Sequence, residues 1–442
     1  MSIQMKYRPP AGWHDYQEAL KRQRQQRRRL GRTIGAALMI AAMIALLFFV
    51  YQSNNFSWRA FTKTPQKTNT LLNPSLAMDE LKALLADQDP IILGASKAVV
   101  ASDKRLLHMT TTINVGLQKQ LTDRLMLRTS AYIGIVVMDA FNGKILAVAS
   151  HDRSNPRANT CLNNRFPAAS IFKIVTAAAA MENARFTPSS IVTYTGGKHT
   201  LYKNQITEKI DRHTTTTTLQ KAFAGSINPV FGKLGAFTLK NASLIDFAHR
   251  FGFERPLDVT LPLAPGAFVI TDQPYQWAEL ASGYNGTTTL SPLQGAMIAA
   301  ATVNEGQWVT PRLIESVTAD NGKIRYQLPH LKTKAIVTQQ TARHLRTVMQ
   351  ATILEGTGRK TFRGWQNDPV LSKLKIGGKT GSYNNNPRYD WFVGFGLDPE
   401  KNHAVAVSVL VGHQDLIGTR AGEYARTALK YHFKNQQQSS QS

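Results

Sequence analysis

The stretch YIGIVVMDAFNGKILAVAS, residues 132–150, indicates the fold class. It holds two runs rich in Val, Ile and Ala, residues 132–139 and 144–150, which are typical of buried β-strands. Asn142-Gly143 lies between the two runs, and this dipeptide is the strongest short-range signal for a hairpin. The pattern therefore predicts two antiparallel strands joined by a tight turn.

Three further apolar runs near the other end of the chain also predict strands, at residues 374–378, 390–397 and 403–411. Helices are expected between and after these groups, at residues 171–181, 219–224, 293–303 and 419–433. Ser291-Pro292 would open the third helix as its N-cap and first residue. Because the early and late strands would share one antiparallel sheet sandwiched by helices, we expect an α+β fold.

An uncharged apolar run, TIGAALMIAAMIALLFFVY at residues 33–51, is about long enough to cross a bilayer as a helix. Nine basic and two acidic residues precede it, so the positive-inside rule places residues 1–32 in the cytoplasm and the rest outside. A cleavable signal peptide would need a shorter apolar run and a small-residue cleavage site, which the following Gln52-Ser53-Asn54 does not provide. We therefore expect one uncleaved transmembrane anchor, rather than a signal peptide or a buried core helix.

The net charge of the chain is +25, from 53 Lys and Arg against 28 Asp and Glu. Such a balance is common in proteins that bind nucleic acid, an anionic membrane surface or an acidic polymer. The arm before the anchor carries +7, which leaves +18 on the outer side. Because nucleic acid is not available there, we expect no nucleic-acid partner. Anionic lipid, acidic wall polymer and a merely solubilising surface remain open as explanations.

The outer part divides into a short leading region and one large domain. Residues 52–109 are expected to form a linker and a short pedestal, with a helix in residues 76–90 and short strands in residues 91–118. Residues 110–434 would form the main domain. The tail NQQQSSQS, residues 435–442, is expected to be disordered.

Metal and cofactor motifs are missing from the sequence. The single cysteine, Cys161, excludes an internal disulfide and a Cys-rich metal site. The eleven histidines are scattered without a His-Glu-x-x-His motif, and no glycine-rich phosphate loop is present. We therefore expect no metal and no cofactor.

Candidate chemistry lies in three short motifs, of which Ser170-Ile-Phe-Lys173 is the first. It places a serine at the start of a predicted helix and a lysine one turn later, on the same helix face. A lysine whose pKa is lowered by burial can take the proton of a serine nucleophile, and a helix N-terminus favours an oxyanion. Alone the pattern is weak, since it recurs at residues 372–375.

The second motif, Ser226-Ile-Asn228, follows the predicted helix at residues 219–224 and is also weak by itself. The third, Lys379-Thr-Gly-Ser382, ends a run of apolar and small residues, so we expect it on a strand beside a cleft. A lysine with two hydroxyls can bind a carboxylate, and the glycine lets a substrate backbone approach closely.

In this order the three motifs are the signature of penicillin-binding proteins and class A β-lactamases. The sequence resembles the penicillin-binding transpeptidase family over residues 110–433. Within this range, segments besides the three motifs also match the family pattern: residues 111–118, 134–150, 165–173, 290–294, 355–358 and 390–394. The resemblance implies a serine β-lactamase/penicillin-binding transpeptidase-like fold after one transmembrane helix. It is closest in organisation to the class B proteins, with an anchor and a very short pedestal.

The resemblance implies a role for each residue of the first two motifs. Ser170 would attack the penultimate D-Ala of a D-Ala-D-Ala stem peptide and form an acyl-enzyme. Lys173 would accept the serine proton. Ser226 would relay a proton to the leaving D-Ala, and Asn228 would hold Lys173 and the substrate amide.

The third motif would bind the end of the substrate. Lys379 would supply positive potential, and Thr380 and Ser382 would bind the terminal carboxylate, with Gly381 allowing the substrate close. Backbone N–H groups of Ser170 and Ser382 would form the oxyanion hole. β-Lactams would acylate Ser170 by the same attack.

Three departures from the family pattern stand out. Ala168-Ala169 replaces the usual Pro-Gly before the serine, so the entry turn is open to change. Ser382 replaces the commoner Thr and keeps the hydroxyl. No glycosyltransferase module precedes the domain, so we expect a glycosyltransferase or other wall-synthesis protein to act in trans.

The leading hypothesis is a peptidoglycan DD-transpeptidase in a bacterial inner membrane, with its catalytic domain in the periplasm or otherwise outside the cytoplasm. A DD-carboxypeptidase, which transfers the acyl group to water, uses the same chemistry. A β-lactamase would need an efficient deacylating base, and no acidic residue stands out as one. A non-catalytic β-lactam sensor or scaffold is the alternative from another class, although the intact motifs favour an enzyme.

Overall fold

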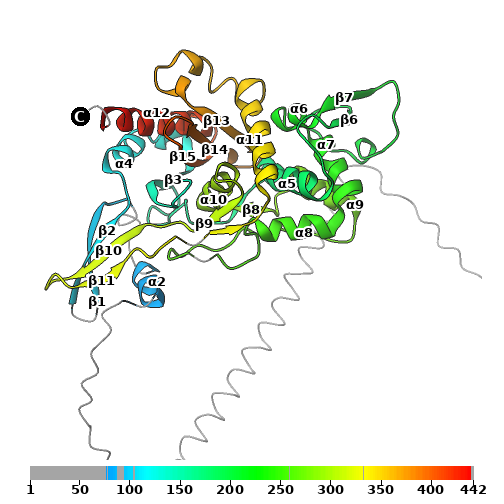
Figure 1. Ribbon diagram of the computed structural model, residues 1–442. Helices are drawn as coiled ribbons and strands as arrows, with labels where there is room; N and C mark the ends of the chain where they lie inside the picture. The colour runs from blue at the N-terminus through cyan, green and yellow to red at the C-terminus, as the bar shows by residue number, and fades with distance from the viewer. Residues whose placement is uncertain are drawn as a thin grey trace, which may run out of the picture. The chain divides into compact units, whose positions relative to one another are not determined.

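The computed structural model describes residues 76, 78–86, 94–102, 105–257, 259–331 and 333–439, which belong to one compact unit, Asn73–Ser442 (Figure 1). The predicted basic arm and the predicted anchor at residues 33–51 lie outside these residues. Among the helices that are described, none is long and apolar enough to cross a membrane.

A five-stranded antiparallel sheet forms the centre of the domain, in the order β13-β14-β15-β3-β4. Its strands are β3 (Ser130–Asp139), β4 (Ile145–Asp152), β13 (Lys375–Tyr383), β14 (Arg388–Asp398) and β15 (His403–His413). The two early strands and the three late strands therefore share one sheet, as the sequence predicts. The pairing of β15 with β3 connects the late strands to the early ones.

The predicted turn between β3 and β4 is present, and its residues explain its shape. The Asp139 carboxylate accepts the backbone N–H groups of Phe141 and Asn142 at 2.9 Å each. Gly143 has a φ of +75°, and a Cβ there would lie 2.2 Å from the Thr310 carbonyl oxygen. Glycine is therefore required at this position both for its backbone conformation and for space.

Both faces of the sheet are buried under helices. Along β15, Val405, Val407 and Val409 belong to one hydrophobic cluster, whereas Ala404 and Ala406 belong to the other. Alternate side chains of a strand point to opposite faces, which explains why the run is apolar without interruption. The predicted sandwich of helices around an antiparallel sheet is confirmed.

One face carries α10 (Pro292–Val303) and α11 (Gln339–Leu354), and the other carries α4 (Val115–Thr122) and α12 (Ala421–Ser439). Ser291 caps α10 by accepting the Gln294 N–H at 3.1 Å, as its position before Pro292 predicts. Residues 115–118, where short strands are expected, instead begin α4, because the Asn114 side chain caps that helix.

A mostly helical region lies beside the sheet and is green in Figure 1. Its helices are α5 (Lys173–Asn183), α6 (Leu219–Ala224), α7 (Asn228–Lys233), α8 (Lys240–Arg250) and α9 (Pro274–Ser282), with a π-helical turn (Leu234–Leu239) between α7 and α8. Two pairs of strands accompany them: β6 (Ile191–Thr195) with β7 (Thr214–Thr218), and β5 (Phe166–Pro167) with β8 (Thr289–Leu290). This region and the sheet together frame the three motifs.

The strands expected in the pedestal segment pair with strands from a distant part of the chain. A four-stranded sheet has the order β1-β2-β10-β11, with strands β1 (Lys97–Ser102), β2 (Arg105–Thr111), β10 (Ile314–Ala319) and β11 (Ile324–Gln327). Helix α2 (Met78–Ala86) packs on this sheet, since Leu81 and Leu85 are buried in one hydrophobic cluster with side chains of its strands. The boundary expected at residues 109–110 thus falls inside β2, and two of the four strands of this sheet come from the segment expected to be the main domain. A short antiparallel pair, β9 (Gln307–Val309) with β12 (Thr333–Ala335), flanks β10 and β11 in the sequence.

The last helix is longer than the sequence predicts. Residues 435–439 continue α12 to Ser439, whereas a disordered tail is expected from residue 435. On this helix His432 stacks against His403, the first residue of β15, with 3.1 Å between the two Nε2 atoms and 5.3 Å between ring centroids. Asp139 Oδ2 lies 3.7 Å from Nδ1 of His403.

This histidine pair predicts a loss of stability in mild acid. Burial, and then the neighbouring His403, lowers the pKa of His432 from 6.5 to about 4, and burial also lowers the pKa of His403. The unfolded chain therefore binds more protons than the folded chain between pH 6.5 and 4. We therefore expect the free energy of unfolding to fall by up to about 3 kcal/mol as the pH is lowered from 6.5 to 4. Urea denaturation at each pH measures it.

His432→Gln should remove much of this pH dependence, because glutamine does not titrate. His330→Gln, at an exposed histidine, is the matched control and should leave the slope unchanged. Equal slopes for His432→Gln and the wild type would contradict the prediction.

Candidate active site

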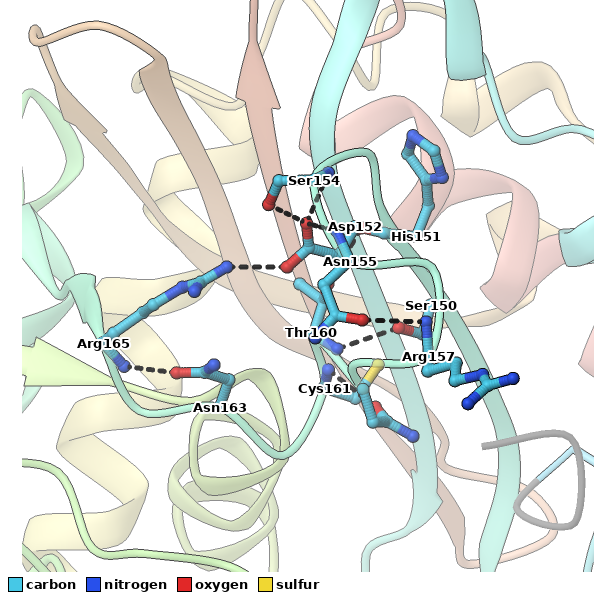
Figure 2. A network of polar contacts seen from close by, with 11 residues as sticks. Ser150, His151, Asp152, Ser154, Asn155, Arg157, Thr160, Cys161, Asn163 and Arg165 are labelled. Atoms are coloured by element: carbon cyan, nitrogen blue, oxygen red, sulfur yellow. Dashed lines mark hydrogen bonds and ion pairs between the residues drawn. The ribbon is translucent and has the colours of Figure 1, made fainter. Parts of the chain in front are cut away.

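The loop that leads to the first motif is held by a buried carboxylate at the end of β4. Asp152 accepts the N–H groups of Ser154 and Asn155 at 2.9 and 3.0 Å, and Arg165 at 2.7 Å (Figure 2). Burial opposes the charged form, but the hydrogen bonds from Ser154 and Asn155 and the charge of Arg165 lower the pKa of Asp152. Arg165 also lies over the ring of Tyr132, so both ends of the loop are tied to the sheet.

The segment after Arg165 is fixed by its backbone. Pro167 in β5 accepts the indole N–H of Trp391 at 2.8 Å, and the N–H of Ala168 donates to the Thr288 carbonyl at 2.8 Å. A 3-10 turn, Ala169–Phe172, follows, and α5 begins only at Lys173. Ser170 therefore lies in a tight turn that enters the helix, and not in the helix itself.

Ala169, next to Ser170, has a left-handed backbone with a φ of +47°. Glycine adopts this region freely, whereas a side chain costs about 1–2 kcal/mol there. The opposing residue, Gly283, could carry no side chain, since a Cβ would lie 1.9 Å from the Ala169 carbonyl oxygen. The turn keeps a glycine-like conformation although this chain has alanine in it.

Lys173 is fully buried, and its Nζ lies among three oxygens. These are Ser170 Oγ at 2.8 Å, Asn228 Oδ1 at 2.7 Å and the Ser282 carbonyl at 2.6 Å. Burial, and then the charge of Lys379, lowers the pKa of Lys173 well below its usual value. A neutral amine donates two hydrogen bonds and accepts one, which matches two acceptor-only oxygens and one hydroxyl.

The second motif lies on the other side of Ser170. Ser226 Oγ is 3.0 Å from Ser170 Oγ, and Ser226 has a positive φ of +54°. Asn228 opens α7, where its Nδ2 donates to the His199 carbonyl at 2.8 Å and its N–H to the Lys198 carbonyl at 2.7 Å. The Asn228 side chain thus links Lys173 to the loop that contains His199.

The third motif lies on β13, as expected. Lys379 is fully buried; its Nζ donates to Ser226 Oγ at 3.0 Å and to the Thr380 carbonyl at 2.9 Å. Burial lowers the pKa of Lys379 to about 7. A Cβ on Gly381 would lie 3.3 Å from Ile171, so this strand packs closely on the turn that holds Ser170, while the Ser382 side chain is exposed.

The structure therefore brings the three motifs together, although the outer two are more than 200 residues apart. Contacts of 2.8–3.0 Å run in series from Lys173 through Ser170 and Ser226 to Lys379. The second Ser-x-x-Lys pattern, residues 372–375, lies in a 3-10 turn and the first residue of β13, with both end side chains exposed.

Sequence reasoning missed three contributors to this site. The Ser282 carbonyl accepts from Lys173, and no side-chain motif signals a backbone oxygen. His199 is tied to Asn228 through its carbonyl, and burial, and then the charge of Lys173, lowers the pKa of its imidazole. Thr357 Oγ1 lies 2.5 Å from Thr380 Oγ1. Thr357 falls in one of the segments of family resemblance, which was its only signal.

A metal is not indicated by side-chain clustering. Within the part of the chain that the structure describes, no three His, Cys, Asp or Glu side chains are grouped so that they could hold an ion. The groups around Ser170 are amines, hydroxyls and amides.

Residues 133–433 match the family model described as the penicillin-binding protein transpeptidase domain. The chain belongs to this family. The recognised fold and the serine and lysine motifs thus coincide in one region, and the resemblance noted from the motifs is confirmed.

Curated relatives carry peptidoglycan and sporulation names. Peptidoglycan D,D-transpeptidase PbpA of Mycolicibacterium smegmatis is 29% identical over 273 residues, covering 59% of this chain and 52% of the relative. Stage V sporulation protein D of Bacillus subtilis is 25% identical over 301 residues, covering 62% and 44%. The chain spans about half the length of these relatives.

Solved structures show the same fold. The D,D-transpeptidase domain of a peptidoglycan glycosyltransferase from Eggerthella lenta has a TM-score of 0.60 at 24% identity, covering 74% of this chain and 83% of that one. Penicillin-binding protein A from Mycobacterium tuberculosis, as its imipenem acyl-enzyme complex, has a TM-score of 0.58 at 23% identity, covering 72% and 78%.

The two alanines before Ser170 provide a matched test of the left-handed turn. Both are buried, but Ala168 has a φ of −65° and Ala169 a φ of +47°. We expect Ala168→Gly to lower the free energy of unfolding by about 1–2 kcal/mol. Ala169→Gly should lower it by less than about 0.5 kcal/mol, because relief of the strained backbone offsets the lost methyl group. Equal losses in denaturant titrations would show that Ala169 is not strained.

Proposed function

We propose that this chain is a serine-type peptidoglycan D,D-transpeptidase, and that it binds β-lactams at the same serine. The single observation that carries the proposal is the series of contacts from Lys173 through Ser170 and Ser226 to Lys379. It gives one hydroxyl both a base and a route for proton return. The family and the names of its relatives support the substrate class, a stem peptide that ends in D-Ala-D-Ala.

Acylation begins at the Ser170 hydroxyl. Its oxygen attacks the carbonyl carbon of the penultimate D-Ala while its proton moves to the neutral Lys173 amine at 2.8 Å. The carbonyl electron pair forms an oxyanion, which the N–H groups of Ser170 and Ser382 are proposed to stabilise. The lowered pKa of Lys173 and the short distance from its Nζ to Ser170 Oγ together favour Lys173 as the base.

Collapse of this intermediate expels the terminal D-Ala. The C–N bond breaks, and the leaving nitrogen takes a proton from Ser226, which is reprotonated by the Lys379 ammonium in contact with it. Ser170 then carries the acyl group as an ester. An amine from a second stem peptide attacks that ester and forms the cross-link, and its proton passes through Ser226 to Lys379. Ser170 takes back the proton held by Lys173, which restores the serine hydroxyl and the neutral base.

The substrate carboxylate would be held by the third motif. Thr380 and Ser382 offer hydroxyls on β13, and Lys379 offers positive potential from beneath. A carboxylate beside Lys379 favours the charged amine, so binding would raise a pKa that burial sets to about 7. The positive charge of Lys379 would thus form beside the carboxylate of the bound substrate.

For the cell, we propose the topology that the sequence suggests, with a single-pass anchor at residues 33–51 in the inner membrane and the catalytic domain outside the cytoplasm. The basic residues before the apolar run support this orientation. A wall-synthesis partner that polymerises glycan belongs to the proposal, because cross-linking needs stem peptides carried on glycan strands.

Labelling with a fluorescent penicillin tests the acyl-enzyme. We expect a stable covalent label on the purified outer domain, none on Ser170→Ala, and about 10²–10⁴-fold slower labelling of Lys173→Met because the base is lost. Ser372→Ala, in the second Ser-x-x-Lys pattern, is the matched control and should label normally. A label retained by Ser170→Ala, or lost from Ser372→Ala, would sink the proposal, and rapid release of the label would indicate a β-lactamase.

Product analysis distinguishes transpeptidase from carboxypeptidase. Nascent glycan strands with pentapeptide stems are incubated with the full chain in detergent, digested, and resolved by mass spectrometry. We expect cross-linked dimers to exceed trimmed tetrapeptides, and both to vanish with Ser170→Ala. Trimmed stems without dimers would assign the chain as a carboxypeptidase instead.

A further inference from the structure

A short turn after α11, residues 355–358, lies beside the site but outside its three motifs. The N–H of Thr357 donates to the Ala224 carbonyl at 3.0 Å. Ala224 ends α6 and stands two residues before Ser226. A Cβ on Gly356 would lie 2.3 Å from the same carbonyl, so only glycine permits this approach. The turn is therefore held against the end of α6, just before the second motif.

The side chain of Thr357 extends to the third motif. Its Oγ1 lies 2.5 Å from Oγ1 of Thr380, a short hydrogen bond in which either hydroxyl can donate. Thr357 thus contacts the end of α6, two residues before the second motif, through its backbone N–H, and the third motif through its hydroxyl. Its side chain is exposed rather than buried in the core, so its hydroxyl is not needed to satisfy a buried polar group.

A bound carboxylate would fix the direction of the hydrogen bond between the Thr357 and Thr380 hydroxyls. A hydroxyl donates one hydrogen bond and accepts up to two. When Thr380 donates its proton to a carboxylate, it cannot also donate to Thr357, so Thr357 must donate to Thr380. Hydrogen bonds in series strengthen one another, and those to a charged group are the stronger ones.

We propose that Thr357 is a positioning residue for carboxylate recognition, acting through Thr380. Its hydroxyl orients the Thr380 proton toward the anionic end of the ligand. This inference rests on the proposed function, since it assumes that Thr380 binds a carboxylate. It makes Thr357 important for ligands that carry a carboxylate and unimportant for acylating agents that lack one.

The test separates binding from chemistry. Stopped-flow acylation by benzylpenicillin, which carries a carboxylate, gives the Kd of the initial complex and the acylation rate constant separately. We expect Thr357→Val, which removes the hydroxyl and keeps the shape, to raise that Kd about five- to tenfold. The acylation rate constant should change less than about twofold, because Thr357 does not touch Ser170 or Lys173.

Two further variants and a second ligand keep the outcome decisive. Thr357→Ser keeps the hydroxyl and should restore the wild-type Kd. Thr347→Val removes an exposed hydroxyl from the outer face of α11 and should have no effect. Phenylboronic acid, which lacks a carboxylate and bonds reversibly to a serine nucleophile, should bind wild type and Thr357→Val equally.

Three results would overturn the inference: an unchanged Kd for benzylpenicillin in Thr357→Val, an equal loss of affinity for phenylboronic acid, or failure of Thr357→Ser to restore binding. Equal loss for both ligands would show a general distortion of the site. Failure of the proposed function itself looks different, since the wild-type chain would then not be acylated through Ser170 at all.

Discussion

Burial of one amine, that of Lys173, is the constraint on which the site depends. A charged ammonium is costly to remove from water, so the amine is favoured in its neutral form. Its neighbours are two acceptor oxygens and one hydroxyl, which is the set that a neutral amine can satisfy. The surrounding helices therefore favour the neutral form of a lysine that contacts Ser170, which is the form that the proposed base requires.

That burial needs the whole domain. α5 carries Lys173, α7 brings Asn228, and α9 ends at Ser282 with its carbonyl on the amine. The sheet adds Lys379 from β13, whose position is set by its pairing with β14. Because Lys379 lowers the pKa of Lys173, the two halves of the domain meet electrostatically as well as by packing.

Close backbone approaches make this meeting possible, and they explain why certain positions are small. Gly283 and Gly356 each lie against a carbonyl oxygen where a side chain would not fit. Ala169 shows the opposite case, since it holds a left-handed turn without being glycine. The position of Ser170 is therefore set by its surroundings more than by the local preference of its own segment.

The sequence by itself determined the central hairpin, the shared sheet, half of the α-helices that the structure describes and the identity of the motif residues, because apolar periodicity, capping and turn residues act locally. It failed where distant segments meet. β10 and β11 joining β1 and β2, the contact of Thr357 with Thr380, and the carbonyl of Ser282 on Lys173 have no local signal. Only the tertiary structure decided these, because a backbone oxygen or a strand partner is chosen by packing, which depends on every element at once.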